Sequence, residues 1–516
     1  MMKKIYLLSL LASVAMQMQA QDQINLDTYI GAQLATEDLN GTARYVGMGG
    51  AMDALGAEIS TMGTNPAGIG LFRSNQISTS MGFIVQEGGK TFQDGSKTNF
   101  SFDQVGIVAA TRTGRQSFVN VGFNFHKSRN FNYVLSAANR AINGSSQNRQ
   151  TTIKGIRGDL DTYWGESQVD NLYYNMILEE DGSVTTIDAS SYEFDRAHTG
   201  YIGEYDFNLS GNLDNRLYLG MTVGVKSVHY EGYSEYFEQL QSLLYPSLTS
   251  VLMSDHHKIS GTGFDIKAGV IVRPIEESPF RFGLSVTTPT WYKLTTHNTT
   301  RIGDVDQIGY DADFRMNTPW KFGVSAGHTI GTNVALGISY EYTDYGAIQM
   351  RAITDSGYDW DGYYLEGSST DHVMKKNTER TLRGVSTLKV GAEFKPDPNI
   401  ALRVGYNYVS PMYQSDGVRD QTLDSPGVYM ASTTDYTNWK STNRFTAGFG
   451  ITLDQFRLDL AYQYSLREGD FYPYMNNVSS SYFDASDQYQ VLTNECEPVN
   501  VKDNRHQVLC TLTYTF

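Results

Sequence analysis

Apolar and polar residues alternate with a period of two along much of this chain. In the stretch 456–467, one face carries Phe456, Leu458, Leu460, Tyr462 and Tyr464, and the other carries Arg457, Asp459, Ala461 and Gln463. The stretches 334–345 and 400–411 repeat the pattern. Because successive side chains of a β-strand point to opposite faces, the pattern predicts strands that separate two different environments.

Fourteen stretches are predicted to be strands: 75–86, 100–112, 117–128, 198–211, 217–230, 259–272, 280–297, 318–329, 334–345, 385–394, 400–411, 442–453, 456–467 and 505–516. Strands of roughly ten to fourteen residues are long for a soluble sandwich but suit a tilted crossing of a bilayer. An even number of strands would place both termini of the chain on the same, periplasmic side of the membrane.

The connections between these stretches alternate in length. The short ones are 113–116, 212–216, 273–279, 330–333, 395–399 and 454–455, and the long ones include 129–197, 231–258, 346–384, 412–441 and 468–504. Short turns at one end and long loops at the other are typical of an outer-membrane barrel. The sequence therefore predicts an all-β protein in which residues 75–516 form a 14-stranded antiparallel transmembrane β-barrel.

The last predicted strand supports a closed barrel. One of its faces carries Val508, Cys510, Leu512, Tyr514 and Phe516. Pairing this strand with the first would remove an exposed, aggregation-prone edge. A closing strand that ends in phenylalanine also resembles the signal read by the outer-membrane assembly machinery, which implies that machinery as a partner.

The first residues have the features of a secretory signal peptide. Lys3 and Lys4 precede the apolar stretch 5–16, and Ala20 offers a small residue at the cleavage position. We expect residues 1–20 to be removed and the mature protein to reach the outer membrane. No later stretch has the roughly twenty consecutive apolar residues that a membrane helix needs.

Composition narrows the classes of function. The mean hydropathy is −0.37, as expected when half of each strand faces a polar lumen, and the 35 Tyr and 24 Phe favour a barrel with aromatic girdles. The net charge of −16, with no basic cluster, argues against nucleic acid as a partner. The two cysteines, Cys496 and Cys510, are expected to be free thiols.

Residues 21–74 are rich in glycine and precede the first predicted strand. They contain Gly47-Met48-Gly49-Gly50-Ala51 and then Asn65-Pro66-Ala67-Gly68. This pair of motifs resembles the N-terminal hatch of the outer-membrane fatty-acid and hydrocarbon transporters, the FadL/TodX family. The resemblance implies that residues 21–74 form a hatch that plugs the lumen, that the protein is a monomer, and that the hatch motif comprises Gly47, Gly49, Gly50, Asn65, Pro66, Ala67 and Gly68. The alternative is that Asn-Pro merely starts a turn and the glycines belong to ordinary loops.

The connection 231–258 carries apolar residues at roughly helical spacing, and Pro246 would divide it into two short helices. We expect short helices in this loop, with a candidate ligand-binding set of Leu240, Leu243, Leu244, Leu248, Val251 and Leu252. An apolar groove that first captures a hydrophobic ligand is one interpretation. Packing of these helices over the barrel mouth is the other.

Catalysis, metal binding and cofactors are not expected. The nine histidines are scattered, and the chain contains no HExxH motif. His126 and Ser128 share one face of the third predicted strand, without a third group that would complete a catalytic set. His256 and His257 are only a lone pair.

These observations predict a passive outer-membrane channel for hydrophobic small molecules, with long-chain fatty acids as the leading substrate and outer-membrane lipid as the surroundings. The resemblance implies capture in loops, binding in a lumenal pocket, and lateral release beside the third strand, where Gly122 is a candidate weak point. Aromatic hydrocarbons, haem and other apolar ligands stay open. The alternatives are a barrel that displays its loops for adhesion or structure, and a general porin, which residues 21–74 argue against.

Overall fold

The computed structural model describes residues 27–157, 186–241, 249–303, 308–358, 360, 364–420, 434–476, 478–483 and 488–516. The predicted signal peptide lies outside these described residues. No described helix is both long and apolar enough to cross a membrane.

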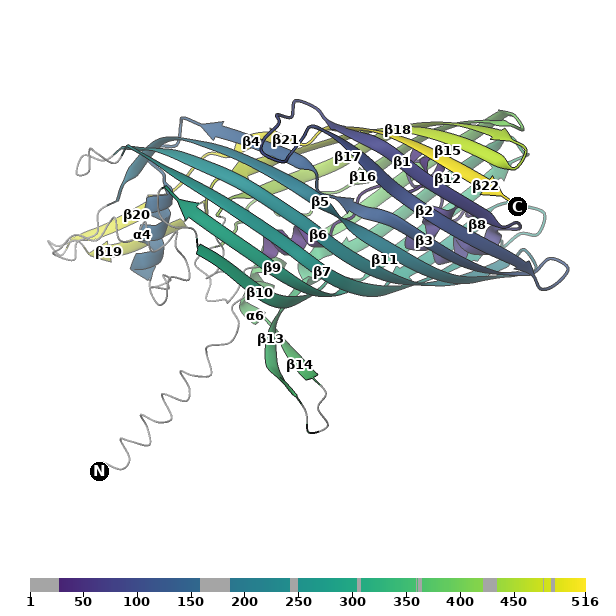
Figure 1. Cartoon of the computed structure of the whole chain (residues 1–516), viewed down its shortest axis with the longest axis horizontal. Helices are drawn as coiled ribbons and strands as arrows, with labels where there is room; N and C mark the ends of the chain where they lie inside the picture. The colour runs from purple at the N-terminus through teal and green to yellow at the C-terminus, as the bar shows by residue number, and fades with distance from the viewer. Residues whose placement is uncertain are drawn as a thin grey trace.

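The strands form one closed antiparallel barrel of 14 strands (Figure 1), as predicted. Several wall strands are interrupted, so that β3 continues as β4, β8 as β9, β10 as β11, β12 as β13, β14 as β15, and β21 as β22. The wall segments are β1 Gln76–Gln86, β2 Thr98–Arg112, β3 Phe118–Asn130, β4 Tyr133–Asn139, β5 Asp188–Leu213, β6 Leu217–Gln241, β7 Ser250–Val272, β8 Arg281–Thr287, β9 Trp291–Ile302, β10 Ile308–Asn317, β11 Lys321–Ile330, β12 Val334–Asp344, β13 Gln349–Tyr358, β14 Tyr364–Thr370, β15 Gly384–Asp397, β16 Ile400–Val409, β17 Tyr436–Leu453, β18 Phe456–Tyr472, β21 Val499–Lys502 and β22 Arg505–Thr515. β1 pairs with β22 and closes the barrel.

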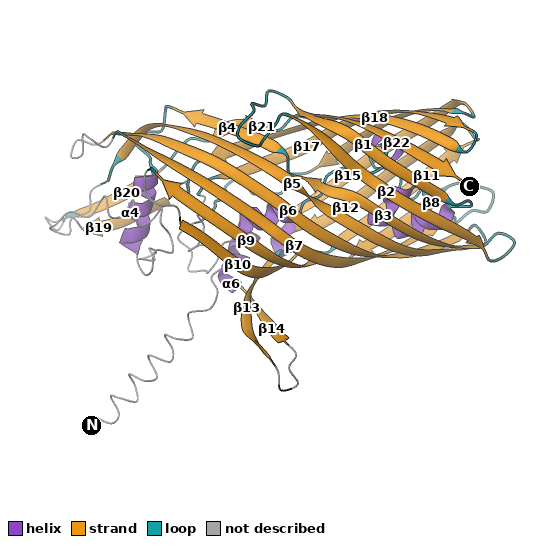
Figure 2. Cartoon of the chain, in the orientation of Figure 1, coloured by secondary structure: helices purple, strands orange, loops and turns teal. Residues whose placement is uncertain are grey.

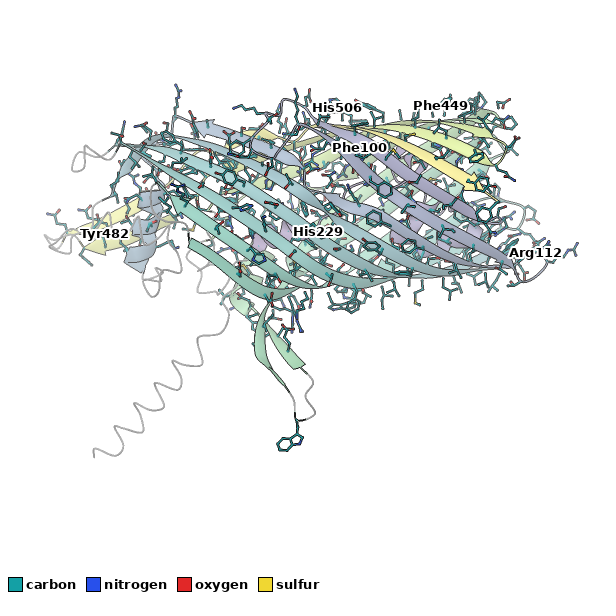
Figure 3. All side chains as sticks on the ribbon, viewed as in Figure 1. Phe100, Arg112, His229, Phe449, Tyr482 and His506 are labelled. Carbon is teal, nitrogen blue, oxygen red and sulfur yellow. The ribbon has the colours of Figure 1, made fainter. Side chains whose placement is uncertain are left out.

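The alternation runs apolar outward and polar inward. Leu458 and Leu460 are 40% and 42% exposed on the outside, whereas Asp459 between them is fully buried in the interior. Figure 3 shows side chains such as Phe100 and Phe449 standing outward from the wall, where both are exposed. This inverted arrangement is what a wall surrounded by lipid requires.

The two ends of the barrel differ. Short turns such as 214–216, 331–333 and 454–455 lie at one end together with Asn75 and Phe516, whose backbones share a hydrogen bond of 3.0 Å. We call this the short-turn end, and the opposite end the long-loop end. At the long-loop end the hairpin of β19 (Val478–Phe483) and β20 (Tyr489–Asn494) lies beside α4 (Gln147–Arg157) (Figure 2).

The predicted helices in 231–258 are wrong for the described residues. β6 continues to Gln241 and β7 begins at Ser250, and the two strands pair from Leu217↔Val272 to Gln239↔Ser250. Short helices do lie in the long connections, but they are α4 and α6 (His372–Thr381). Tyr233, Tyr236, Phe237 and Leu240 do recur at helical spacing, but the cross-strand ladder with β7 makes the stretch a strand.

The N-terminal segment, residues 27–74, lies inside the barrel (purple in Figure 1). It contains α2 (Thr28–Ala35), α3 (Ala43–Gly47), η1 (Ile59–Gly63) and η2 (Pro66–Leu71). α2, α3 and η2 begin where the sequence supplies a side-chain cap: for example, the Asp27 carboxylate accepts from the backbone N–H groups of Tyr29 and Ile30. A further short helix, η3 (Tyr345–Ala347), separates β12 from β13.

The ladder between β2 and β3 is incomplete. The two strands pair from Arg112↔Phe118 to Gln104↔His126, and no pairing follows beyond that point. β3 continues to pair with β5 on its other side. Farther along, the Gln86 side chain joins β1 to β4 through two hydrogen bonds with the backbone of Val134, of 2.8 and 2.9 Å. The wall therefore has a break between β2 and β3, which begins beyond the pair Gln104↔His126 and ends where Gln86 binds Val134.

Candidate functional site

The first glycine motif of the N-terminal segment rests on a row of wall glycines. Gly327, Gly337, Gly391 and Gly405 are direct cross-strand partners on β11, β12, β15 and β16. A Cβ on Gly337 would overlap the Ala51 carbonyl oxygen, and one on Gly391 the Met48 carbonyl oxygen. The row therefore lets the backbone of residues 48–51 lie directly against the wall.

The Asn65-Pro66-Ala67-Gly68 motif also lies against wall glycines. We call this pair of glycines and the row described above the two glycine seats. Gly220 and Gly269 are cross-strand partners on β6 and β7. Asn65 Oδ1 lies where a Cβ on Gly269 would be, and the Pro66 carbonyl carbon lies where one on Gly220 would be. The same Asn65 oxygen accepts a hydrogen bond of 3.2 Å from the Ala67 N–H. The first motif thus touches the wall through its backbone, and the second through the Pro66 backbone and the short side chain of Asn65.

The other motif glycines have separate roles. Gly49 and Gly50 adopt φ angles of 63° and 79°, a left-handed conformation that favours glycine. A Cβ on Gly47 would lie 3.2 Å from the Cα of Gly448. Gly68 faces Thr61 within the segment itself. These contacts explain why larger residues are excluded at these positions.

A cavity of about 180 Å³ lies between α2 and the wall, in the half of the barrel toward the long-loop end. Seven aromatic residues line it, together with smaller apolar residues such as Ile30, Leu135, Val409 and Met412: the aromatic ones are Tyr29, Phe131, Tyr133, Tyr230, Tyr413, Tyr436 and Trp439. Tyr29 of α2 stacks on Tyr413, with ring centroids 5.2 Å apart. The N-terminal segment therefore forms one side of the cavity and the wall forms the rest.

One end of this cavity is cationic. Arg129, Arg467 and Arg505 line both the cavity and a smaller adjoining pocket of about 50 Å³, whose lining also holds Arg444. Two carboxylates, Asp38 and Asp503, complete the charged lining of the smaller pocket. We call these four arginines the arginine cluster. Its four positive charges exceed the two negative charges of Asp38 and Asp503, so the cluster favours binding of an anionic group.

The aromatic lining and the arginine cluster are in contact. The Arg467 guanidinium lies 4.1 Å from the centroid of the Trp439 ring, and that of Arg505 lies 5.6 Å from the Tyr133 ring. Stacking of this kind holds a guanidinium at the edge of an apolar surface. The combined site is amphipathic: it joins aromatic surface to the arginine cluster, and its lining also holds Arg196 and Arg419 with Asp255 and Asp435.

The N-terminal segment fills the break between β2 and β3. The Asp38 N–H donates to the Ser128 carbonyl at 2.8 Å, and the Asp38 carboxylate accepts from the Asn130 N–H at 2.9 Å. Asn40 donates to the Lys127 carbonyl at 3.1 Å and to the Asp103 carboxylate on β2 at 3.0 Å. Asp38 and Asn40 thus supply hydrogen bonds where the strand ladder stops.

Asp38 also pairs with the arginine cluster. Its Oδ1 lies 2.8 Å from Arg129 Nη1 and 3.9 Å from Arg444 Nη2. Burial acts to raise the pKa of Asp38, but Arg129, Arg505 and Arg444 outweigh it and hold that pKa below its usual value. The carboxylate therefore stays ionised at neutral pH.

Glu37 anchors the same stretch on its other side. It accepts from Lys226 at 2.9 Å and from Lys321. Lys226 also lies 3.3 Å from Glu204 and 3.4 Å from Asp265. Removal of Glu37 would leave Lys226 with its wall carboxylates but free the N-terminal segment at this point.

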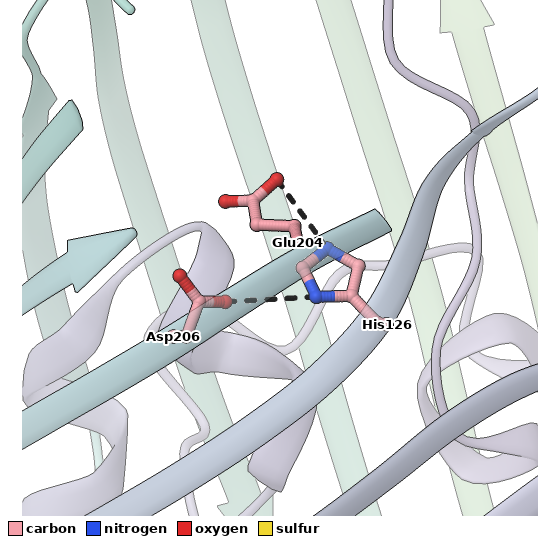
Figure 4. Close-up of side chains that lie close together, drawn as sticks. All are labelled: His126, Glu204 and Asp206. Carbon is pink, nitrogen blue, oxygen red and sulfur yellow. Dashed lines mark ion pairs between the residues drawn. The ribbon is translucent and has the colours of Figure 1, made fainter. Parts of the chain in front are cut away.

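His126, Glu204 and Asp206 form the one group among the described residues that offers three metal-ligand side chains close together (Figure 4). The imidazole lies 3.6 Å from Asp206 and 3.8 Å from Glu204. Lys267 already contacts the same carboxylates, at 2.5 Å from Glu204 and 3.0 Å from Asp206. Because an ammonium group already balances this charge, we assign the three residues to the ion network of the wall.

Of the predicted loop residues, Leu240, Val251 and Leu252 are described and lie at the long-loop end. Leu240 and Val251 are buried in a cluster with Phe471 and Tyr474, and Leu252 is 44% exposed. Leu243, Leu244 and Leu248 lie outside the described residues. Gly122 lies in the middle of β3 and pairs with Val108 and Asn208, so it is enclosed by ladder on both sides.

Sequence reasoning missed the arginine cluster and the row of wall glycines. The arginines come from β3, β17, β18 and β22, so no local spacing links them. The glycines left a signal, because each stands at an inward position of an alternating strand, but their register becomes apparent only from the pairing. Cys496 and Cys510 are free thiols, as predicted.

No protein-family model matches the chain, and no curated protein matches its sequence. Solved structures do resemble it. A FadL homologue of Pseudomonas aeruginosa is 13% identical, with a TM-score of 0.50 and coverage of 93% of this chain and 100% of that one. The toluene transporters TbuX of Ralstonia pickettii and TodX of Pseudomonas putida are 11% and 12% identical, with TM-scores of 0.47 and 0.45, and each match covers 93% of this chain and 99% of the other. At 13% identity, the likeness to the FadL homologue shows a shared barrel fold alone.

Proposed function

We propose that this chain, whose fold is that of a FadL-type transporter barrel, is a passive outer-membrane channel for hydrophobic small molecules. Long-chain fatty acids are the leading substrates. In this proposal residues 1–20 direct export, residues 21–74 are the hatch, and residues 75–516 are the barrel, which acts as a monomer.

The observation that carries the proposal is the amphipathic cavity. Aromatic side chains line it, and Arg129, Arg467 and Arg505 stand where it adjoins the smaller pocket. An alkyl chain gains about 0.8 kcal/mol for each CH₂ removed from water, and guanidinium groups bind carboxylates strongly. A fatty acid satisfies both parts of this lining, whereas a neutral hydrocarbon satisfies only the first.

The proposed route has three steps. Apolar residues at the long-loop end, with Leu240, Leu243, Leu244, Leu248, Val251 and Leu252 as candidates, first capture the ligand. The ligand then enters the cavity beside α2. It leaves sideways into the bilayer through the break between β2 and β3, once Asp38 and Asn40 move away from it.

Lateral release has a physical advantage for such a ligand. A water-filled pore would expose the alkyl chain, whereas a path from an apolar cavity into lipid keeps it covered. The barrel below the cavity is occupied by residues 43–71, which lie on the two glycine seats. Those residues would also prevent leakage of water and ions toward the short-turn end.

Uptake of a radiolabelled long-chain fatty acid tests the proposal, in an outer-membrane host that lacks its own channel for it. The wild-type chain should restore uptake. Thr437→Trp should place a large ring in the cavity lining and reduce uptake about tenfold, the factor that corresponds to 1.4 kcal/mol.

Val121→Trp is the matched control, because Val121 faces outward and is 57% exposed. It should assemble and transport normally. Absence of uptake by a correctly assembled wild-type barrel would refute the proposed function.

A further inference from the structure

The stretch Thr36–Asn40 is held in the ladder break by charged groups as well as by backbone hydrogen bonds. Asp38 contributes both kinds of contact, since its N–H binds Ser128 and its carboxylate binds Arg129 and the Asn130 N–H. It is the one residue of the described N-terminal segment that lines the smaller pocket with a carboxylate. Any group that takes its arginine partner therefore acts directly on the residue that fills the break.

Arg129 is poised to change partners. Only its Nη1 binds Asp38, and its buried Nε has no hydrogen-bond partner. Arg129 also lines the cavity, so a ligand in the cavity can reach it. A guanidinium that presents Nε and an Nη side by side binds a carboxylate through two parallel hydrogen bonds, and this geometry is stronger than a single contact.

The neighbouring arginines favour the arrival of an anion. Asp503 pairs with both Arg467 and Arg505, which leaves Asp38 as the carboxylate that faces Arg129 and Arg444. A second carboxylate at Arg129 would repel Asp38 while it competes for the same N–H groups.

We propose that Asp38 is a carboxylate latch and that an anionic amphipathic ligand opens the β2–β3 break by displacing it from Arg129. The inference rests on the transport function proposed above and adds its regulation and ligand class. The ligand's own acid group opens the exit, so a neutral molecule of the same length enters the cavity without releasing the latch. No covalent step is involved.

Hydrogen exchange measured by mass spectrometry on the whole purified protein tests the latch without reference to transport. The probes are a long-chain fatty acid and the fatty alcohol of the same chain length. The acid should increase exchange in the peptide that contains residues 36–41, because the Asp38 N–H leaves the Ser128 carbonyl. The alcohol should not. Unchanged exchange with the acid, or an equal increase with both, would overturn the proposal.

Two matched variants extend the test to uptake. Asp38→Asn removes the charge that holds the latch but nearly preserves the shape of the side chain. It should raise alcohol uptake at least about fivefold, toward that of the acid. Glu58→Gln removes an equal charge from the same N-terminal segment, but Glu58 lies beside Arg44 and lines neither pocket, so alcohol uptake should stay at the wild-type level.

The outcomes separate the latch from the proposed function. Wild-type uptake of acid together with identical behaviour of the two variants would overturn the latch and leave transport standing. Failure of the wild-type protein to take up either probe would overturn transport itself. If Asp38→Asn does not assemble, hydrogen exchange on the wild-type protein still decides.

Discussion

At the scale of single residues, absent side chains determine how the N-terminal segment meets the wall. Gly337, Gly391 and Gly405 leave space that the backbone of residues 48–51 occupies. Gly220 and Gly269 do the same for Asn65 and Pro66. Protein interiors are packed too closely to absorb an added methyl group at such contacts without displacement.

We therefore expect Gly337→Ala to push Ala51 away from the wall. Overpacking of this kind typically costs about 1–3 kcal/mol, and here the cost should fall on the seating of the segment, since the strand can accept alanine. Ion conductance in planar bilayers should rise while the barrel still assembles. Gly357→Ala is the control, because a Cβ there meets nothing within 4 Å. Equal conductance in the two variants would contradict the proposal that close contact between Ala51 and Gly337 holds the segment in place.

The combined change Asn65→Ala and Pro66→Gly should loosen the second seat. It removes a cap whose loss costs about 1 kcal/mol, and it frees a φ angle that proline fixes. Transport should fall, and heat-modifiability on gels should be retained, because the strand ladder carries barrel stability. Normal transport would show that the motif is an ordinary turn.

At the scale of elements, the wall strands have unequal lengths and interruptions. β5, β6 and β7 extend beyond the range that the alternation predicted, while β8 and β9 are separated near Pro289 and β10 and β11 near Pro319. Proline cannot donate to a ladder, which explains interruptions at these points. The break between β2 and β3 contains no proline, and residues of the N-terminal segment fill it instead.

The apolar residues between β6 and β7 allow an element-scale test of ligand capture. Changing Leu243, Leu244 and Leu248 to Asp should lower fatty-acid uptake, because charged groups would face the incoming alkyl chain. Barrel assembly should be unaffected. Uptake equal to wild type in this triple variant would restrict these residues to a structural role at the barrel mouth.

At the scale of the whole molecule, the barrel is apolar on the outside and polar on the inside, and it encloses its own N-terminal segment. The outward row of wall residues is apolar, and the buried interior holds ion pairs such as Lys267 with Asp265 and Arg403 with Asp459. The ladder satisfies the backbone of the wall, which a lipid environment demands. Transport and barrel stability can therefore be separated.

Deletion of residues 21–74 tests that separation. The truncated protein should still reach the outer membrane and run as a heat-modifiable barrel, because none of its wall strands is lost. Its conductance should rise well above that of the full chain, since the lumen would fill with water. A deletion variant with unchanged conductance would mean that the segment does not plug the barrel, and recovery of the full chain as a soluble periplasmic protein would contradict the membrane assignment.

The sequence by itself determined the barrel, its strand number and which face of each strand points outward, because a period of two fixes the direction of every side chain once one face lies in lipid. It also identified the two glycine motifs. It predicted a helix in 231–241, where the apolar residues have helical spacing, and only the pairing of β6 with β7 makes this stretch a strand. Only the tertiary structure brought Arg129, Arg444, Arg467 and Arg505 together around Asp38. They come from four strands far apart in the chain, and closure of the barrel sets their distances.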